Sequence, residues 1–100
     1  MFAIEKNREG DTLTLVIKGI LNTKTAPDLS KELNGLENDY KTLIFEFSEL
    51  DYLTSAGLRV LLQAEQDAED NDRQMIVRHV SKEIMDIFTQ TGFINVLTIE

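Results

Sequence analysis

The spacing of apolar residues switches between two periods along the chain, and this switching constrains the fold more than any other feature. Leu13, Leu15 and Ile17 recur at every second position of TLTLVIKG, which is the period of a strand with one buried face. Apolar and small residues recur three and four positions apart in SAGLRVLLQAEQDAED, which is the period of an amphipathic helix. A chain that alternates between these periods predicts an α/β domain built in layers.

The two periods divide the whole chain into eight expected elements. The polar turn REGD joins two strands, MFAIEK and TLTLVIKG, as a hairpin, and further strands are KTLIFEF, RQMIVRHV and INVLTI. The expected helices are TAPDLSKELNGLEN, SAGLRVLLQAEQDAED and SKEIMDIFTQTG. The predicted order is β-β-α-β-α-β-α-β, in a mixed sheet with parallel central pairs and helices packed in layers. We expect residues 1–100 to form one domain, since a chain of this length supplies one core.

Local signals mark where the helices begin and end. Thr25 is the predicted N-cap of the first helix, with Pro27 in its first turn and Asp28 as the capping-box partner. Ser81 is the predicted N-cap of the last helix, which should end near Gly92.

The chain has few of the residues that catalysis and metal binding require. It has no cysteine, which excludes disulfides and thiolate metal sites, and His79 is its only histidine. His79 falls inside a predicted strand, where a sheet-surface residue is the simplest interpretation, so a nucleophilic Ser55 would have no base. The glycines lack the spacing of a phosphate-binding loop, and the carboxylates of EQDAEDND lack the order of a calcium loop. We therefore expect no enzyme, no metal and no cofactor.

The net charge of −8 limits the classes of partner. Binding to nucleic acid needs Lys and Arg side chains that displace counterions from phosphates, so we expect no direct nucleic acid partner. No apolar run reaches the roughly 18 residues of a membrane span, and the start MFAIEKNREG lacks the features of a signal peptide. We therefore expect a cytoplasmic chain without membrane insertion, whose partners are proteins.

The stretch YLTSAGLRVLL places a hydroxyl group where a helix begins. Thr54 or Ser55 stands at this N-terminus, beyond the carboxyl end of a central strand, where α/β sheets carry their sites. Ser and Thr are preferred N-caps, so a purely structural cap is one interpretation. A phosphate would also be well placed on the unpaired N–H groups and the positive end of the helix dipole, so a phosphorylation site is the other.

Around these residues the sequence resembles the STAS domains, and within them the bacterial anti-sigma factor antagonists, also called anti-anti-sigma factors. The resemblance spans nearly the whole chain and is carried by IKGILNTKTAPDL, LIFEFSELDYLTSAGLRVLL and IFTQTGFINVLTI. The middle stretch is the most specific, since it matches the family's Asp-Ser-Ser/Thr-Gly-Leu turn. Ser55, Gly57 and Leu58 take the positions of the first Ser, the Gly and the Leu.

The resemblance implies a phosphorylation switch. In that family the first serine of the turn is phosphorylated by an anti-sigma factor that is a serine kinase, and a metal-dependent serine phosphatase resets it. This chain would then bind the kinase when unmodified and release it when Ser55 is phosphorylated, so regulating sigma-factor-dependent transcription. Thr54 stands where the family often has Asp and is the rival acceptor, Ala56 replaces the second hydroxyl residue, and Asn22 stands where an earlier loop often has Asp.

The predicted contact surface joins two segments that should leave the same edge of the sheet. The predicted partner-binding residues are Asn22, Thr23, Lys24, Thr54, Ser55, Gly57, Leu58 and Arg59. Leu58 lies beside the apolar stripe of its helix, so the core is its alternative position. Two other functions stay open: a STAS scaffold subunit of a signalling or lipid-transport complex, with Ser55 only a cap, and a binder of a small ligand or nucleotide.

Overall fold

One mixed sheet organises the chain, of which the computed structural model describes residues 1–37 and 39–100. The elements are β1 (Ala3–Glu9), β2 (Thr12–Leu21), α1 (Ala26–Asn34), β3 (Thr42–Glu46), β4 (Leu50–Leu53), α2 (Ser55–Asp70), β5 (Gln74–Arg78), α3 (Lys82–Thr91) and the 3-10 helix η1 (Phe93–Asn95). The predicted α/β class with a mixed sheet is confirmed, and α2 has the predicted bounds. The predicted first helix ends earlier, at Asn34, and the last residue of its stretch, Asn38, lies outside the described residues.

The long strand β2 connects two parts of the sheet. Strands β1, β2, β3 and β5 lie side by side in that order, and β4 pairs with the end of β2. The β1–β2 pair is the predicted antiparallel hairpin, whereas β2–β3, β3–β5 and β2–β4 are parallel. Thr12–Val16 of β2 pair with β3, and Gly19–Leu21 pair with β4. Gly19 lies at the register shift with φ +93°, and an added Cβ would come within 1.9 Å of the Met1 carbonyl oxygen, so only glycine fits.

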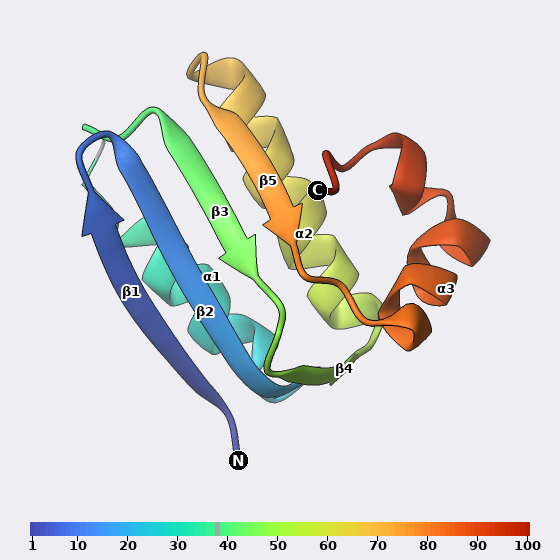
Figure 1. Cartoon of the computed structure of the whole chain (residues 1–100). Coiled ribbons are helices and arrows are strands. Elements are labelled where there is room, and N and C mark those ends of the chain that lie inside the picture. Colours follow the sequence, from blue (N-terminus) through green and yellow to red (C-terminus); the bar gives the residue numbers. More distant parts are fainter. Residues whose placement is uncertain (38) are drawn as a thin grey trace.

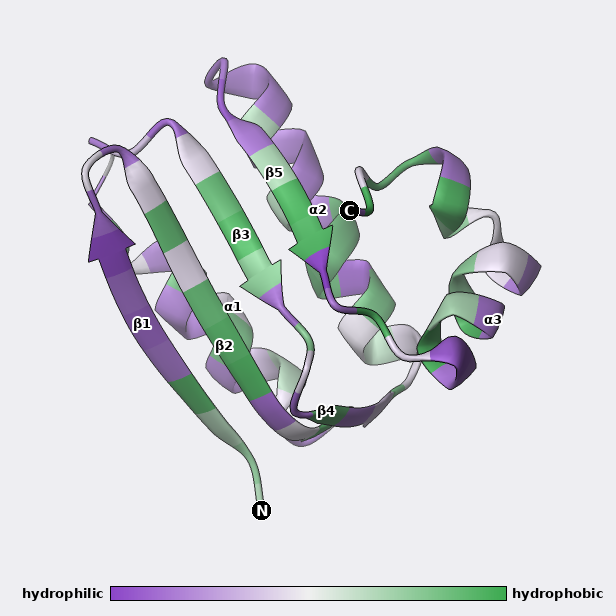
Figure 2. Cartoon of the chain, in the orientation of Figure 1, coloured by the Kyte–Doolittle hydropathy of each residue, from purple (hydrophilic) through white to green (hydrophobic). Residues whose placement is uncertain are grey.

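The helices α1 and α2 lie together on one face of the sheet, and α3 lies near β4 at the end of β5 (Figure 1). The core forms between this face and the helices, because side chains at alternate strand positions point toward them. Figure 2 shows the hydropathy of each residue along the sheet. The edge strand β1 is mostly hydrophilic, whereas the middle of β3 and of β5 is hydrophobic. The largest side chains of this core are fully buried: Leu15, Ile17, Leu21, Leu29, Phe45, Phe47, Leu53, Leu61, Val77, Ile84 and Phe88.

Three strand predictions need correction. The stretch INVLTI is not a regular strand, because Phe93–Asn95 form η1 and only Ile99 pairs with Val77, in one parallel bridge. The short strand β4 was not predicted, because its buried residues Leu50 and Leu53 enclose two exposed ones and do not alternate at period two. Strand β5 ends at Arg78, so His79 follows the strand and does not lie within it.

The helix ends agree with the sequence at α3 and differ at α1. Ser81 Oγ accepts the Ile84 N–H at 3.3 Å, and Gly92 ends α3 with φ +82°, as predicted. Thr25 is the N-cap residue of α1, as predicted, but its predicted capping box with Asp28 is wrong, because Thr25 Oγ1 donates to Ile20 O at 2.8 Å and α1 has no side-chain cap within the described residues. Within that same part of the chain, no helix has the length and apolar content to cross a membrane.

Candidate functional site

Two loops meet where β2 and β4 end. Leu21 and Leu53, the last residues of these parallel strands, are register partners, and the Thr54 N–H donates to Leu21 O at 3.0 Å. The segment that follows β2, residues 22–25, therefore lies beside the first turn of α2. The structure brings together the two segments that carry the predicted contact residues.

Asn22 holds the first loop in a fixed shape. Its Oδ1 accepts the N–H of Lys24 at 2.9 Å and the N–H of Thr25 at 3.1 Å. Its own N–H donates to Thr25 Oγ1 at 2.8 Å. Thr23 and Lys24 are left with exposed side chains. A carboxylate would accept the same N–H groups, so Asn22 supplies the loop geometry that an aspartate would supply.

Ser55 presents the accessible hydroxyl of the site. It is the first residue of α2 and is exposed, whereas Thr54 is the extended N-cap residue with φ −111° and ψ −178°. Thr54 Oγ1 is buried and has no hydrogen-bond partner among residues 1–37 and 39–100. The position of Thr54 at the N-cap agrees with the sequence, but its side chain makes no cap there. The first N–H groups of a helix have no intrahelical acceptor, so an anion on Ser55 would lie beside unsatisfied donors.

Gly57 and Leu58 support the site from inside. A Cβ on Gly57 would lie 2.9 Å from Cγ and Cδ2 of the buried Leu21, so the absence of a side chain lets α2 approach the end of β2. Leu58 is 6% exposed and belongs to the core, which is the alternative position that the sequence left open for it. Arg59 follows with an exposed side chain, so it is the residue of this turn that reaches outward.

A groove between α1 and α2, which we call the α1–α2 groove, extends this surface away from Ser55. Its volume is about 610 Å³ and its lining is mainly apolar: Thr23, Ala26, Pro27, Ser30, Lys31, Asn34, Ala56, Arg59 and Val60. Of these lining residues, only Thr23 and Arg59 belong to the contact surface predicted from the sequence. Helical spacing could have indicated others, since Pro27, Ser30 and Asn34 recur three and four positions apart on one face of α1.

The only histidine is engaged with a carboxylate. His79 Nδ1 lies 2.9 Å from Glu46 Oε1 and 2.8 Å from Glu46 Oε2, and the Ser48 N–H donates to Glu46 Oε2 at 3.1 Å. Burial by itself would raise the pKa of Glu46, but the hydrogen bonds with His79 and Ser48 outweigh it and hold that pKa below its usual value. In the part of the chain that the structure describes, no group of three or more His, Cys, Asp or Glu side chains is arranged to hold a metal ion.

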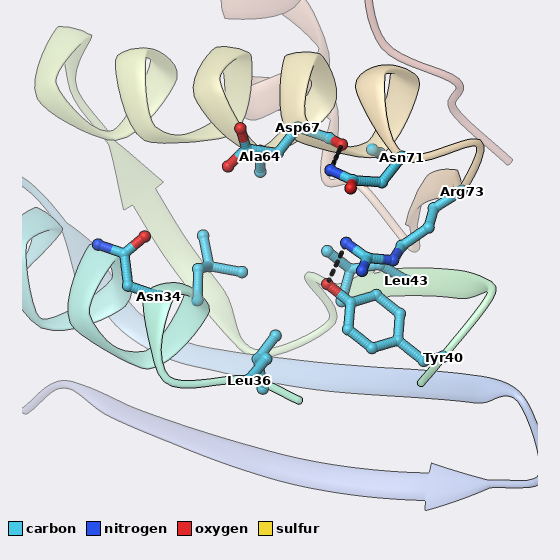
Figure 3. A pocket seen from close by; sticks show the side chains of 10 residues that line it. Asn34, Leu36, Tyr40, Leu43, Ala64, Asp67, Asn71 and Arg73 are labelled. Carbon is cyan, nitrogen blue, oxygen red and sulfur yellow. Dashed lines mark hydrogen bonds between the residues drawn. The ribbon is translucent and has the colours of Figure 1, made fainter. Parts of the chain in front are cut away.

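A second cavity, shown in Figure 3, lies at the opposite end of α2. The Arg73 guanidinium lies 4.4 Å from the centre of the Tyr40 ring, and its Nη1 donates to the Tyr40 hydroxyl at 3.5 Å. Since α2 has 16 residues and is about 24 Å long, this cavity is separate from the site around Ser55. Its volume is about 330 Å³ and its lining residues are Leu33, Asn34, Leu36, Tyr40, Leu43, Ala64, Asp67, Ala68, Asn71 and Arg73.

Comparison with protein families and sequences places this geometry among known proteins. The family model described as STAS domain matches residues 3–100. The chain is 23% identical over 88 residues to BtrV of Bordetella bronchiseptica, whose name assigns it to the anti-sigma factor antagonists. This match covers 87% of the chain and 76% of BtrV.

Solved structures share the fold. An anti-sigma factor antagonist from Mycobacterium paratuberculosis superposes with a TM-score of 0.88 at 16% identity, over 99% of this chain and 85% of that one. The Bacillus anti-sigma factor antagonist SpoIIAA superposes in its unphosphorylated form with a TM-score of 0.76 at 18% identity, over 100% of this chain and 87% of that one. Its phosphorylated form gives a TM-score of 0.75 at 17% identity, over 100% and 91%. Mglu also matches, with a TM-score of 0.70 at 18% identity over 78% of this chain, which spans 20% of Mglu.

Proposed function

The chain belongs to the STAS domain family, and from this premise we propose that it is an anti-sigma factor antagonist switched by phosphorylation of Ser55. Unmodified, it binds an anti-sigma factor that is a serine kinase and so frees a sigma factor for transcription. Phosphorylated, it releases the kinase until a metal-dependent serine phosphatase resets it. In this function the chain acts in the cytoplasm as a binding protein and performs no catalysis itself.

The observation that carries the proposal is the exposed Ser55 at the first residue of α2, beside the loop of residues 22–25. The relatives support it, because BtrV and SpoIIAA are named as anti-sigma factor antagonists and SpoIIAA occurs in a phosphorylated form. The burial of Thr54 Oγ1 favours Ser55 over Thr54 as the acceptor, because a kinase must reach the hydroxyl it modifies.

Phosphorylation is expected to change the surface and leave the fold intact. A phosphoserine carries roughly −1.5 to −2 charges, and a negative charge at a helix N-terminus stabilises by roughly 0.3 to 2 kcal/mol. The energetic cost of the modification therefore falls on the interface. A dianion that faces a kinase surface shaped for a hydroxyl costs several kcal/mol there, and at about 1.4 kcal/mol per factor of ten the affinity falls on the order of a hundredfold or more.

The test is incubation of the chain with each anti-sigma factor kinase of its own organism and ATP, followed by mass spectrometry of the peptide that contains YLTSAGLRVLL. We expect one phosphate, on Ser55, with one of these kinases. The Ser55→Ala variant should stay unmodified, and the Thr54→Val variant should be modified like the wild type. If no kinase modifies the chain, the proposal fails and the scaffold function becomes the better explanation. Modification of Thr54 in place of Ser55 would move the switch by one residue.

A further inference from the structure

The α1–α2 groove combines an apolar floor with positive charge at its border. Ala26 and Pro27 of α1 face Ala56 and Val60 of α2 across it. Val60 is 8% exposed and Ala26 is 5% exposed, so these two residues anchor the floor in the core. The volume of about 610 Å³ lies within the roughly 300 to 1,000 Å³ that binding pockets in proteins have.

Two cations, Lys31 and Arg59, line the groove. A third, the exposed Lys24, follows the lining residue Thr23 in the chain. Within residues 1–37 and 39–100, none of these three side chains forms an ion pair, whereas lysines and arginines elsewhere, such as Lys18 and Arg78, do. This positive border stands on a chain with a net charge of −8. The acidic residues of α1, Asp28 and Glu32, do not line the groove. They line a different hollow together with residues of β1, and Lys31 lines that hollow as well.

We propose that the α1–α2 groove binds a partner segment in which an apolar side chain is flanked by Asp or Glu residues. The apolar side chain enters between α1 and α2, and the carboxylates pair with Lys24, Lys31 and Arg59. The inference rests on the proposed function in one respect, since the partner that carries the segment is then the anti-sigma factor.

Charge and continuity argue for this occupant. The groove begins at Ala56, directly after Ser55, so a partner that covers the serine reaches the groove without a gap. Opposite charge at an interface adds specificity and speeds association, whereas a basic segment would be repelled by the three cations. Arg59 lies four residues after Ser55 and therefore on the same side of α2. A phosphate on Ser55 would pair with Arg59 and repel the carboxylates of the segment, which couples the groove to the switch.

The first experiment needs no identified partner. The wild-type chain is immobilised and used to select from a phage-displayed library of random peptides, with the charge-reversal variant Lys31→Glu/Arg59→Glu as comparison. The matched control is Lys41→Glu/Lys82→Glu, which reverses two exposed lysines that do not line the groove and that form no ion pair within the described residues. Thermal melts of all three proteins verify that they fold.

We expect the selected peptides to carry an apolar residue next to Asp or Glu. Their affinity should fall roughly tenfold or more in Lys31→Glu/Arg59→Glu and stay within about twofold in the control. Selection of peptides without acidic residues, equal binding to both variants, or no enrichment on the folded wild type would each overturn the proposal.

The second experiment separates this inference from the proposed function. The kinase that phosphorylates Ser55 is titrated against the same two variants at low and at high salt. Weaker binding by Lys31→Glu/Arg59→Glu, with a difference that shrinks as salt rises, supports the groove. If the kinase binds both variants like the wild type, the groove inference is wrong and the switch stands. If no kinase modifies Ser55 but acidic peptides bind the groove, the proposed function is wrong and the groove stands.

Discussion

At Gly57 the backbone of α2 comes so close to Leu21 that a single methyl group has no room. We expect Gly57→Ala to unfold at lower urea concentration than the wild type. An added Cβ would lie 2.9 Å from the buried Leu21 side chain, and such overpacking costs about 1 to 3 kcal/mol. This cost exceeds the roughly 1 kcal/mol by which Ala stabilises a helix relative to Gly. The control is Gly35→Ala, whose Cβ would lie at an ordinary 3.4 Å from Lys31 O. Equal losses in both variants would contradict the argument.

Ser55 is exposed and follows the N-cap residue Thr54, so removal of its hydroxyl should affect binding and leave folding almost unchanged. We expect Ser55→Ala and Ser55→Glu to melt within about 1 kcal/mol of the wild type, the usual upper effect of an N-terminal helix residue. Titration calorimetry against the cognate kinase should show tight binding by Ser55→Ala and weak binding by Ser55→Glu. If the two variants bind alike, Ser55 has only a structural role.

The carboxylate of Glu46 makes the stability dependent on pH. Because the pKa of Glu46 in the folded chain lies below its ordinary value, the ionised form stabilises the fold above that ordinary value, and the effect is lost as the pH falls through the folded pKa. We expect Glu46→Gln to be about 0.5 to 1 kcal/mol less stable than the wild type at neutral pH. Urea unfolding across the acidic range should show the two stability curves converging as the pH falls. Curves that stay parallel would assign the effect to something other than ionisation.

At the scale of single residues, the sequence predicted hydroxyl groups at the N-terminus of α2 but not which of them is exposed. It placed a hydroxyl at the helix N-terminus, and the structure has Thr54 at the N-cap and Ser55 beside it. The choice between the two depends on which hydroxyl is buried, and that follows from how β4 sets the angle at which the chain enters α2. The same tertiary packing decides that Leu58 is in the core.

The C-terminal end of α2 holds an acidic residue in a strained backbone conformation. Asp72 has φ +54°, a backbone conformation that glycine adopts at a lower energetic cost than residues with a Cβ. The negative charge of Asp72 also interacts unfavourably with the dipole of α2. We expect Asp72→Gly to stabilise the chain by roughly 0.5 to 1 kcal/mol, measured as a higher Tm. Asp70→Gly, which also removes a charge but lies within α2, should bring no such gain, because glycine has a lower helix propensity than aspartate. Stabilisation by both changes would assign the gain to charge alone.

At the level of elements, long periodic stretches were predictable and short ones were not. The helix over residues 55–70 has four turns of regular spacing, and the sequence gives its bounds correctly. The four residues of β4 are too few to show a period, and they become a strand only because the end of β2 offers hydrogen bonds. The INVLTI stretch has strand-forming residues, but Gly92 turns the chain into η1 and leaves only Ile99 against β5.

The whole chain shows why its total charge is a poor guide to a partner. A net charge of −8 is read directly from the sequence and argues against nucleic acid. The sequence does not reveal that Lys31 and Arg59 line one groove, next to the loop that carries Lys24, because only the fold brings the loop and the two helices together. The surface that we propose for recognition therefore has the opposite sign of charge from the whole chain.

The predicted contact surface is discontinuous in the chain, and this leads to a prediction at the scale of the whole molecule. Residues 22–25 and 54–59 are adjacent because β2 and β4 pair and the Thr54 N–H donates to Leu21 O. We expect the cognate kinase to phosphorylate a peptide of sequence YLTSAGLRVLL at less than about one hundredth of the rate for the folded chain, since the peptide supplies one segment without the other and without a stable helix. Parallel kinase assays at equal concentration provide the measurement. Similar rates would mean that the kinase reads a linear motif.

In the proposed function, the parallel pairing of β2 and β4 is a condition on signalling. A copy that has unfolded or has not finished folding lacks the paired strands, so we expect it neither to capture the kinase nor to become its substrate. The kinase would then respond to the concentration of folded copies alone. A mutation in the core, far from Ser55, would lower the signal through the folded fraction alone, with the affinity of each folded copy unchanged.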